Sequence, residues 1–63
     1  MEPHQKRVVA EKADLEGKIE RLTNFLGTER FASLDADEQD RMRRQLGHMS
    51  AYSAVLGERI AAF

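Results

Sequence analysis

The stretch Pro3–Leu26, PHQKRVVAEKADLEGKIERLTNFL, carries the apolar pattern that decides the fold. Its apolar residues repeat every seven positions in two series that are offset by four, Val8, Leu15 and Leu22 in the first and Ile19 and Leu26 in the second. Such a repeat is typical of a helix that packs along another helix. Pro3 suits a first helical turn, where its missing N–H would have no partner anyway. The pattern predicts a helix over about 3–26, with Lys12 as the polar exception on its packing face.

A second heptad pattern follows further along the chain and predicts a helix over about 36–62. Its packing face is expected to consist of Met42, Leu46, Met49, Ser53, Leu56, Ile60 and Phe63. Residues 27–35 should form the turn, with Gly27 ending the first helix in the left-handed conformation. Asp35 should cap the second helix, and Glu38 should reach back to complete a capping box.

Two helices of similar length joined by a short turn predict one all-α domain over 1–63, an antiparallel two-helix hairpin. A chain below roughly 70–80 residues buries little surface and normally needs an additional source of stability. The chain has no Cys, and His4 and His48 alone do not make a zinc site. We therefore expect self-association into a homo-oligomeric helical bundle, from a dimer to a hexamer.

Charge and composition argue against several classes of function. Ten basic against eleven acidic residues give no field that attracts duplex nucleic acid. No apolar run approaches the ~18 residues of a membrane span, and no signal peptide is recognisable, so a cytoplasmic protein without a membrane partner is expected. Gly-rich phosphate loops, nucleophile–base pairs and metal-ligand clusters are absent from the pattern. We therefore expect no enzyme activity, no metal and no cofactor.

Two contrasting faces flank the packing face of the second helix. One carries only small residues, which would let another helix approach closely: Gly47, Ser50, Ala54, Gly57 and Ala61. The other carries hydrogen-bond donors and an aromatic ring without any carboxylate: Arg41, Gln45, His48, Tyr52 and Arg59. Arginine binds phosphate in a two-pronged fashion, and tyrosine stacks on nucleobases. An ordinary solvated flank beside the core remains the alternative interpretation of this polar row.

The candidate ligand-binding residues come from this polar row and from the first helix: Arg7, Lys12, Gln45, His48, Tyr52 and Arg59. Arg7 belongs to a flank of the first helix that it shares with Lys18 and Arg21, and this flank also carries the acidic Glu11 and Asp14. Lys12 has a second interpretation, because a single polar residue on a packing face often sets the register of two helices.

Three parts of the sequence are more specific than a heptad pattern: the opening Arg7–Lys12, Tyr52, and the ending Glu58–Ile60. With the pattern over nearly the whole chain, they resemble the small helical-hairpin sponge proteins of phages and prophages that counter CBASS and Thoeris immunity. The resemblance implies a homo-oligomer, often a hexamer, that binds a cyclic nucleotide signal of the host. Such proteins sequester the signal without hydrolysing it. The candidate site residues come from the polar face and are not carried over from that family.

Two main functions therefore stay open. The first is a phage or prophage anti-defence protein that sequesters a cyclic nucleotide immune signal, which the carboxylate-free row and the resemblance favour. The second is a small helical inhibitor or adaptor that docks on a host protein, which the small size, balanced charge and small-residue face favour. A purely structural oligomeric module is a third hypothesis. A rise in melting temperature with cyclic nucleotides would distinguish the first from the second.

Overall fold

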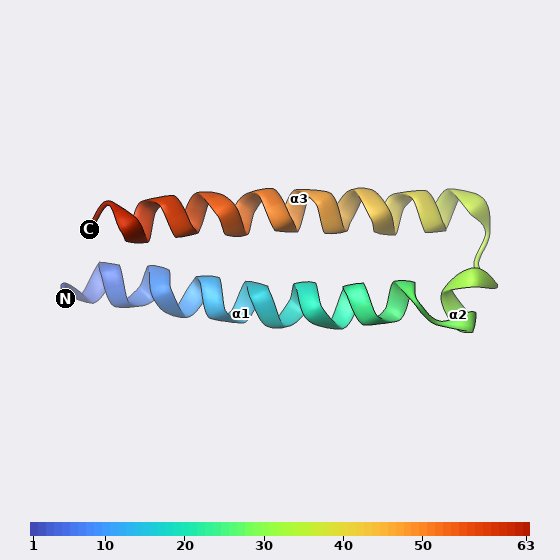
Figure 1. Ribbon diagram of the computed structural model, residues 1–63, viewed down its shortest axis with the longest axis horizontal. Coiled ribbons are helices and arrows are strands. Elements are labelled where there is room, and N and C mark those ends of the chain that lie inside the picture. Colours follow the sequence, from blue (N-terminus) through green and yellow to red (C-terminus); the bar gives the residue numbers. More distant parts are fainter.

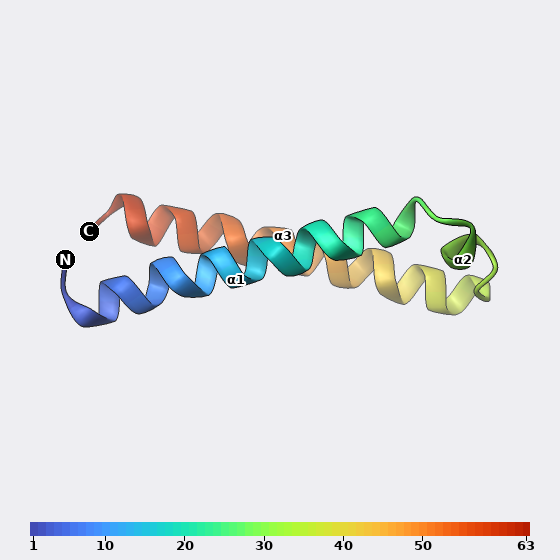
Figure 2. The same cartoon turned by 90° about the horizontal axis from the view of Figure 1, so that it is seen from below.

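The computed structural model describes all 63 residues and contains three helices and no strand. Helix α1 spans Pro3–Leu26, α2 spans Glu29–Ala32 and α3 spans Ala36–Ala61. The long helices α1 and α3 lie side by side and run in opposite directions, so both chain ends lie at one end of the molecule (Figure 1). Figure 2 shows that they cross at a shallow angle. The Cα atoms extend over 46 × 14 × 13 Å, and the predicted all-helical class is confirmed.

Helix α2 lies inside the stretch where the sequence predicts only a turn. It begins after Thr28, whose Oγ1 accepts a hydrogen bond from the Phe31 N–H at 3.2 Å. The prediction of a left-handed Gly27 is wrong, since this residue has a φ of −90°. Its N–H donates to the Asn24 carbonyl at 3.2 Å. The chain therefore leaves α1 through an ordinary turn and passes directly to the Thr28 cap.

The start of α3 agrees only in part with the predicted capping box. As expected, Asp35 caps the helix, because its Oδ2 accepts a hydrogen bond from the Glu38 N–H at 3.3 Å. The Glu38 carboxylate does not reach back. It accepts a hydrogen bond from Arg41 Nε at 2.8 Å instead. The ion pair one turn along the helix therefore replaces the second half of the box.

The connected end of the helix pair holds its own small cluster of contacts. Phe31 on α2 is buried and packs edge-on against Phe25, with the ring centres 6.1 Å apart. The Arg43 guanidinium lies 5.1 Å from the centre of the Phe31 ring, within the range of a cation–π interaction. The Gln39 side-chain amide donates to two backbone carbonyls of the connection, at 3.2 and 2.9 Å. These contacts fix the connection between α1 and α3.

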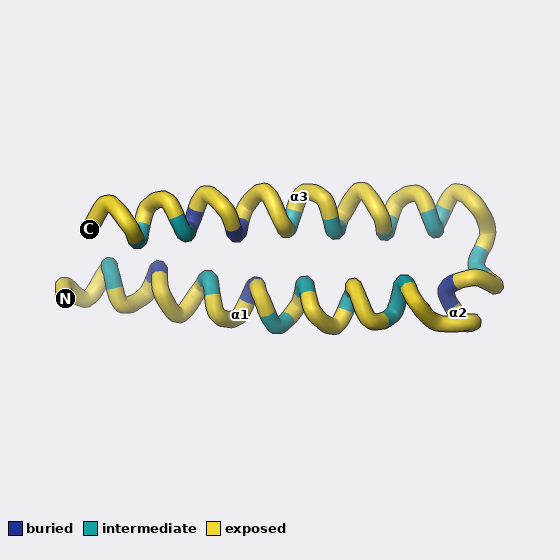
Figure 3. The backbone as a smooth tube through the Cα atoms, in the orientation of Figure 1, coloured by how far each residue is buried: buried dark blue, intermediate teal, exposed yellow.

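The core is one layer of side chains between the two long helices. Its buried apolar members are Val8, Leu15 and Leu56. The half-buried residues packed against them are Ile19, Met49 and Ile60. Figure 3 shows the buried and half-buried segments along the facing sides of α1 and α3. All six of these core residues stand at heptad positions that were predicted from the sequence.

Two polar residues of the packing faces lie at the helix–helix contact, whereas the last apolar residue of the second packing face does not. Ser53 is buried and Lys12 is half-buried, as expected for residues at the helix–helix contact. Phe63, which the sequence places on the packing face, is 43% exposed. It lies beyond Ala61, the last residue of α3, so the helix no longer directs it toward α1.

Most of the surface of this helix pair stays exposed. Five of the 63 residues are buried. The large apolar side chains that remain exposed are Met1, Val9, Tyr52, Val55 and Phe63. Neither long helix has a stretch apolar enough to cross a membrane. The single chain therefore leaves apolar surface for further contacts.

Candidate functional site

Two open hollows lie on the side of the helix pair that carries Tyr52. The first, of about 470 Å³, is lined by Arg7, Ala10, Glu11, Asp14, Leu15, Lys18 and Tyr52. The second, of about 420 Å³, is lined by Arg41, Arg44, Gln45, His48, Met49 and Tyr52. Both volumes fall within the roughly 300–1,000 Å³ that small-molecule sites occupy. We call the first the mixed-charge hollow and the second the cationic hollow.

Tyr52 belongs to the lining of both hollows. It shares the lining of the mixed-charge hollow with residues of α1, while 45% of the residue remains exposed. A partly exposed ring offers a flat face to a planar ligand. Tyr52 is therefore the point at which one ligand can contact both hollows.

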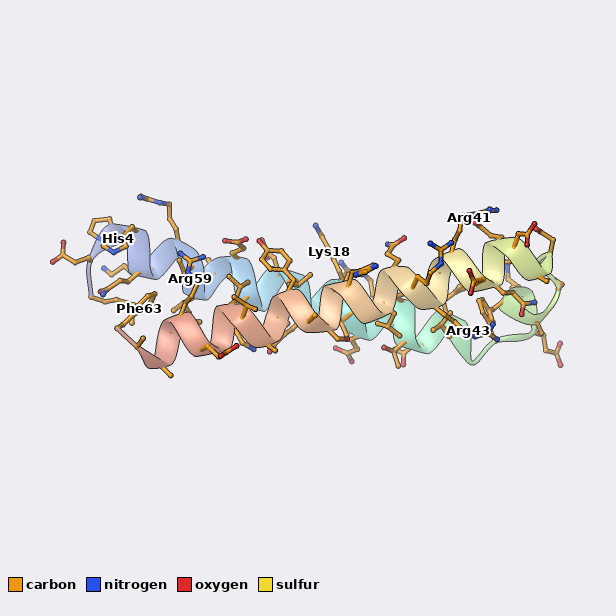
Figure 4. The ribbon with its side chains drawn as sticks, turned by 90° about the horizontal axis from the view of Figure 1, so that it is seen from above. His4, Lys18, Arg41, Arg43, Arg59 and Phe63 are labelled. Carbon is orange, nitrogen blue, oxygen red and sulfur yellow. The ribbon has the colours of Figure 1, made fainter.

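The mixed-charge hollow takes its charges from one face of α1. Arg7, Glu11, Asp14 and Lys18 follow one another at intervals of four, three and four residues, a spacing that aligns side chains on one side of a helix. None of the three ion pairs of the structure includes these four charged groups, but Arg7 with Glu11 and Asp14 with Lys18 stand four residues apart, a spacing at which opposite charges attract each other on a helix. Figure 4 shows Lys18 projecting from the pair of helices. The hollow therefore presents two cations and two carboxylates.

The cationic hollow has no carboxylate in its lining. The hydrogen bond from Arg41 Nε to Glu38 raises the pKa of the Arg41 guanidinium above its ordinary value. Arg44 Nε donates to Asp40 at 2.9 Å. Ion pairs as exposed as these contribute little to stability. An anionic ligand can therefore replace Glu38 and Asp40 as the partner of the two guanidinium groups.

The six predicted site residues do not lie together in one hollow of the structure. Arg7 and Tyr52 line the mixed-charge hollow, and Gln45 and His48 line the cationic hollow together with Tyr52. Arg59 lines neither hollow and lies toward the end of the rod where the labels His4 and Phe63 stand in Figure 4.

Lys12, the sixth predicted residue, lines neither hollow. It forms an ion pair with Glu16. A Cβ built at Gly57, in the small-residue row, would lie 3.3 Å from Lys12 Cε. Lys12 therefore borders the small-residue face and not the face of Tyr52.

Sequence reasoning left several lining residues out of the site. Glu11, Asp14 and Lys18 stand on the flank of Arg7, and their heptad-like spacing was a sufficient signal to include them with Arg7. Arg44 lies three residues after Arg41 and four before His48, which also predicts a shared face. No three His, Asp or Glu side chains gather as the ligands of a metal ion would.

Fold and site together define a small helical protein with an open, polar face on one side. The chain matches the family model described as Sequestin over residues 2–62. The protein therefore belongs to the Sequestin family, and this membership indicates a protein that sequesters a ligand or partner. No curated protein matches the chain. No solved structure matches it either.

Proposed function

We propose that this protein is a phage or prophage anti-defence protein that sequesters a cyclic nucleotide immune signal in the cytoplasm of the bacterial host. The observation that carries the proposal is Tyr52, which lies between two ligand-sized hollows, one of them lined by cations without a carboxylate. Membership in the Sequestin family supports the sequestering role. The resemblance to phage sponge proteins supports the class of ligand.

The chemistry of the two hollows suits the two parts of a nucleotide. Arg41 and Arg44 offer planar guanidinium groups that bind phosphate oxygens with paired hydrogen bonds. Gln45 and His48 add donors at the same hollow. A nucleobase stacks on the ring of Tyr52, an interaction that every base can make. Phosphate and base are thus held by neighbouring groups on one side of α3.

Sequestration requires binding alone. A protein that is more abundant than the signal, with a Kd below the signal concentration, lowers the free concentration that the host effector detects. We propose no enzyme activity for this site, so the nucleotide is released chemically unchanged when the protein unfolds. This property separates a sponge from a hydrolase in a direct experiment.

The working form in this proposal is a homo-oligomer, from a dimer to a hexamer. A single helix pair buries five of its 63 residues and leaves Val9 and Val55 exposed. Small domains of this kind gain stability when copies cover each other's apolar surface. The small-residue face gives a second copy room to approach, since no atom lies within 4 Å of a Cβ built at Gly47.

The test measures melting temperature with a panel of cyclic di- and trinucleotides. A ligand at 100 times its Kd should stabilise the protein by about 2.7 kcal/mol. The nucleotide should then be recovered intact after heat denaturation. If no cyclic nucleotide changes the melting temperature, the proposal fails, and docking on a host protein through the small-residue face becomes the better hypothesis. A shortened or linearised nucleotide would contradict sequestration without hydrolysis.

A further inference from the structure

We propose that Glu38 exchanges partners when an anion enters the cationic hollow: it leaves Arg41 and accepts a hydrogen bond from the Asp35 N–H. The proposal rests on the proposed function, since it concerns how phosphate groups enter this hollow. Glu38 does not line the hollow. It acts through Arg41, which does, and is therefore a positioning residue. The observation that carries the proposal is a backbone N–H at the start of α3 that has no partner within the protein.

The two long helices begin in different ways. In each, the third helical residue can accept a hydrogen bond from the backbone N–H of the cap residue. At the start of α1, Gln5 does so, because its Oε1 accepts from the Glu2 N–H at 2.9 Å. At the start of α3, Glu38 holds the same position relative to Asp35. The Asp35 N–H nevertheless makes no hydrogen bond within the protein, so the capping box of α3 is open.

Arg41 is the partner that keeps this box open. It lies near the start of α3 (Figure 4), and its Nε donates to Glu38 Oε1 at 2.8 Å. The side chains of Arg41 and Glu38 are 58% and 42% exposed, so water and dissolved anions reach both of them. Exposed ion pairs are weak and are screened by salt. An anion in the hollow can therefore compete with Glu38 for Arg41.

The donor that Glu38 occupies is one that a phosphate needs. Arginine binds phosphate most strongly through two parallel N–H groups, and Nε–H is one of the two along the side edge of the guanidinium. A phosphate that binds along this edge must displace Glu38. The displaced carboxylate stands three residues from Asp35, where a free N–H and the N-terminus of α3 both favour a negative group. Anion binding thus closes the capping box of α3.

Two variants separate the loss of the ion pair from the closing of the box. Glu38→Gln can still close the box, as Gln5 does on α1, but it lacks the charge that holds Arg41. Glu38→Ala also frees Arg41 and cannot close the box. The probe is inorganic pyrophosphate, titrated while NMR spectra are recorded. Its dissociation constant should fall about two- to fivefold in both variants, the scale of one exposed ion pair.

The matched control is Glu58→Gln, which makes the same change of net charge on the same helix. Glu58 is exposed, forms no ion pair and lines neither hollow. This variant should bind pyrophosphate as the wild-type protein does. If it gains as much affinity as Glu38→Gln, net charge alone explains the gain and the proposal is overturned.

Hydrogen exchange of the Asp35 amide reports the second partner of Glu38. In the wild-type protein, saturating pyrophosphate should slow this exchange about two- to tenfold, the scale of one hydrogen bond. In Glu38→Gln, the amide should exchange slowly with and without pyrophosphate. In Glu38→Ala, it should exchange fast in both conditions.

Three results would overturn the proposal. Pyrophosphate could bind the wild-type protein and Glu38→Gln equally, or it could bind neither. It could also slow the Asp35 amide in Glu38→Ala as much as in the wild-type protein, which would make the slowing independent of Glu38. The melting experiment with cyclic nucleotides tests the proposed function separately. If no cyclic nucleotide binds while pyrophosphate gives the expected results, the proposed function fails and the exchange of partners by Glu38 stands.

Discussion

The ring of Tyr52 lines both hollows, and 45% of the residue remains exposed. Stacking of a base on such a ring contributes about 1–3 kcal/mol. We expect Tyr52→Ala to weaken cyclic nucleotide binding by that amount in calorimetry. The melting temperature without ligand should change little, because Tyr52 lies outside the buried core.

Val55 supplies the control for the Tyr52 variant. It is 51% exposed on the same helix and lines neither hollow, so Val55→Ala should leave binding unaltered. Equal affinities in the wild-type protein and in Tyr52→Ala would show that the ring is not part of the site.

Arg44 permits a second test at the scale of one residue. Its guanidinium lines the cationic hollow and is held only by an exposed ion pair with Asp40. Hydrogen bonds to charged groups contribute about 1.5–3 kcal/mol. Arg44→Ala should weaken nucleotide binding on that scale, and added salt should reduce the difference. Arg30→Ala, which removes an exposed arginine from α2 outside both hollows, should have no such effect in the same titration.

At the scale of the elements, the packing of α3 on α1 depends most on Leu56. It is 1% exposed, the lowest value of any core residue. Truncation of a buried leucine lowers stability by about 2–5 kcal/mol. Leu56→Ala should lower the free energy of unfolding by this amount in urea titrations. Val55→Ala, at the exposed neighbouring position, should barely change it. A small effect at Leu56 would mean that the two helices do not pack as the structure shows.

The two long helices could be predicted because a heptad pattern is regular over many turns. The Asp35 cap could be predicted as well, since its side chain bonds locally. The four residues of α2 are too few to show a period. The partner of Arg41 could not be chosen in advance, because carboxylates stand both three and four residues before it. The structure selects the nearer one, Glu38.

The candidate site was predictable as a row on α3 but not as two hollows. The mixed-charge hollow depends on side chains of both helices, and the short Ala10 on α1 contributes to it. The cationic hollow is lined by residues of α3 alone, but its lining includes Arg44 and Met49, which lie outside the predicted row. Tyr52 and Arg59 stand seven residues apart on the same flank of α3, yet only Tyr52 lines a hollow. Lys12 borders the packing face and could point to either side. In the structure, the Lys12 side chain forms an ion pair with Glu16 and lies beside Gly57.

At the scale of the whole molecule, the small-residue face is the surface through which we propose that copies of the chain assemble. Gly47 has open space around it, and Ala54 is exposed on the same row. If this face joins copies of the chain, the melting temperature should rise with protein concentration, because association stabilises by mass action. Ala54→Leu should then lower the assembly order seen by light scattering, since a bulky side chain keeps the helices apart.

Ala13 provides the matched control for Ala54→Leu, because it is an equally small, exposed residue that lies on α1 and not in the small-residue row of α3. Ala13→Leu should leave the assembly order unchanged. A second variant separates assembly from helix propensity. Gly47→Ala should stabilise a lone helix pair by about 1 kcal/mol, but it should weaken an oligomer in which another helix packs against Gly47. Two results together would show that this face is open to solvent and that ligand binding belongs to the single chain. The wild-type protein would stay monomeric at micromolar concentration, and Gly47→Ala would be more stable than the wild type.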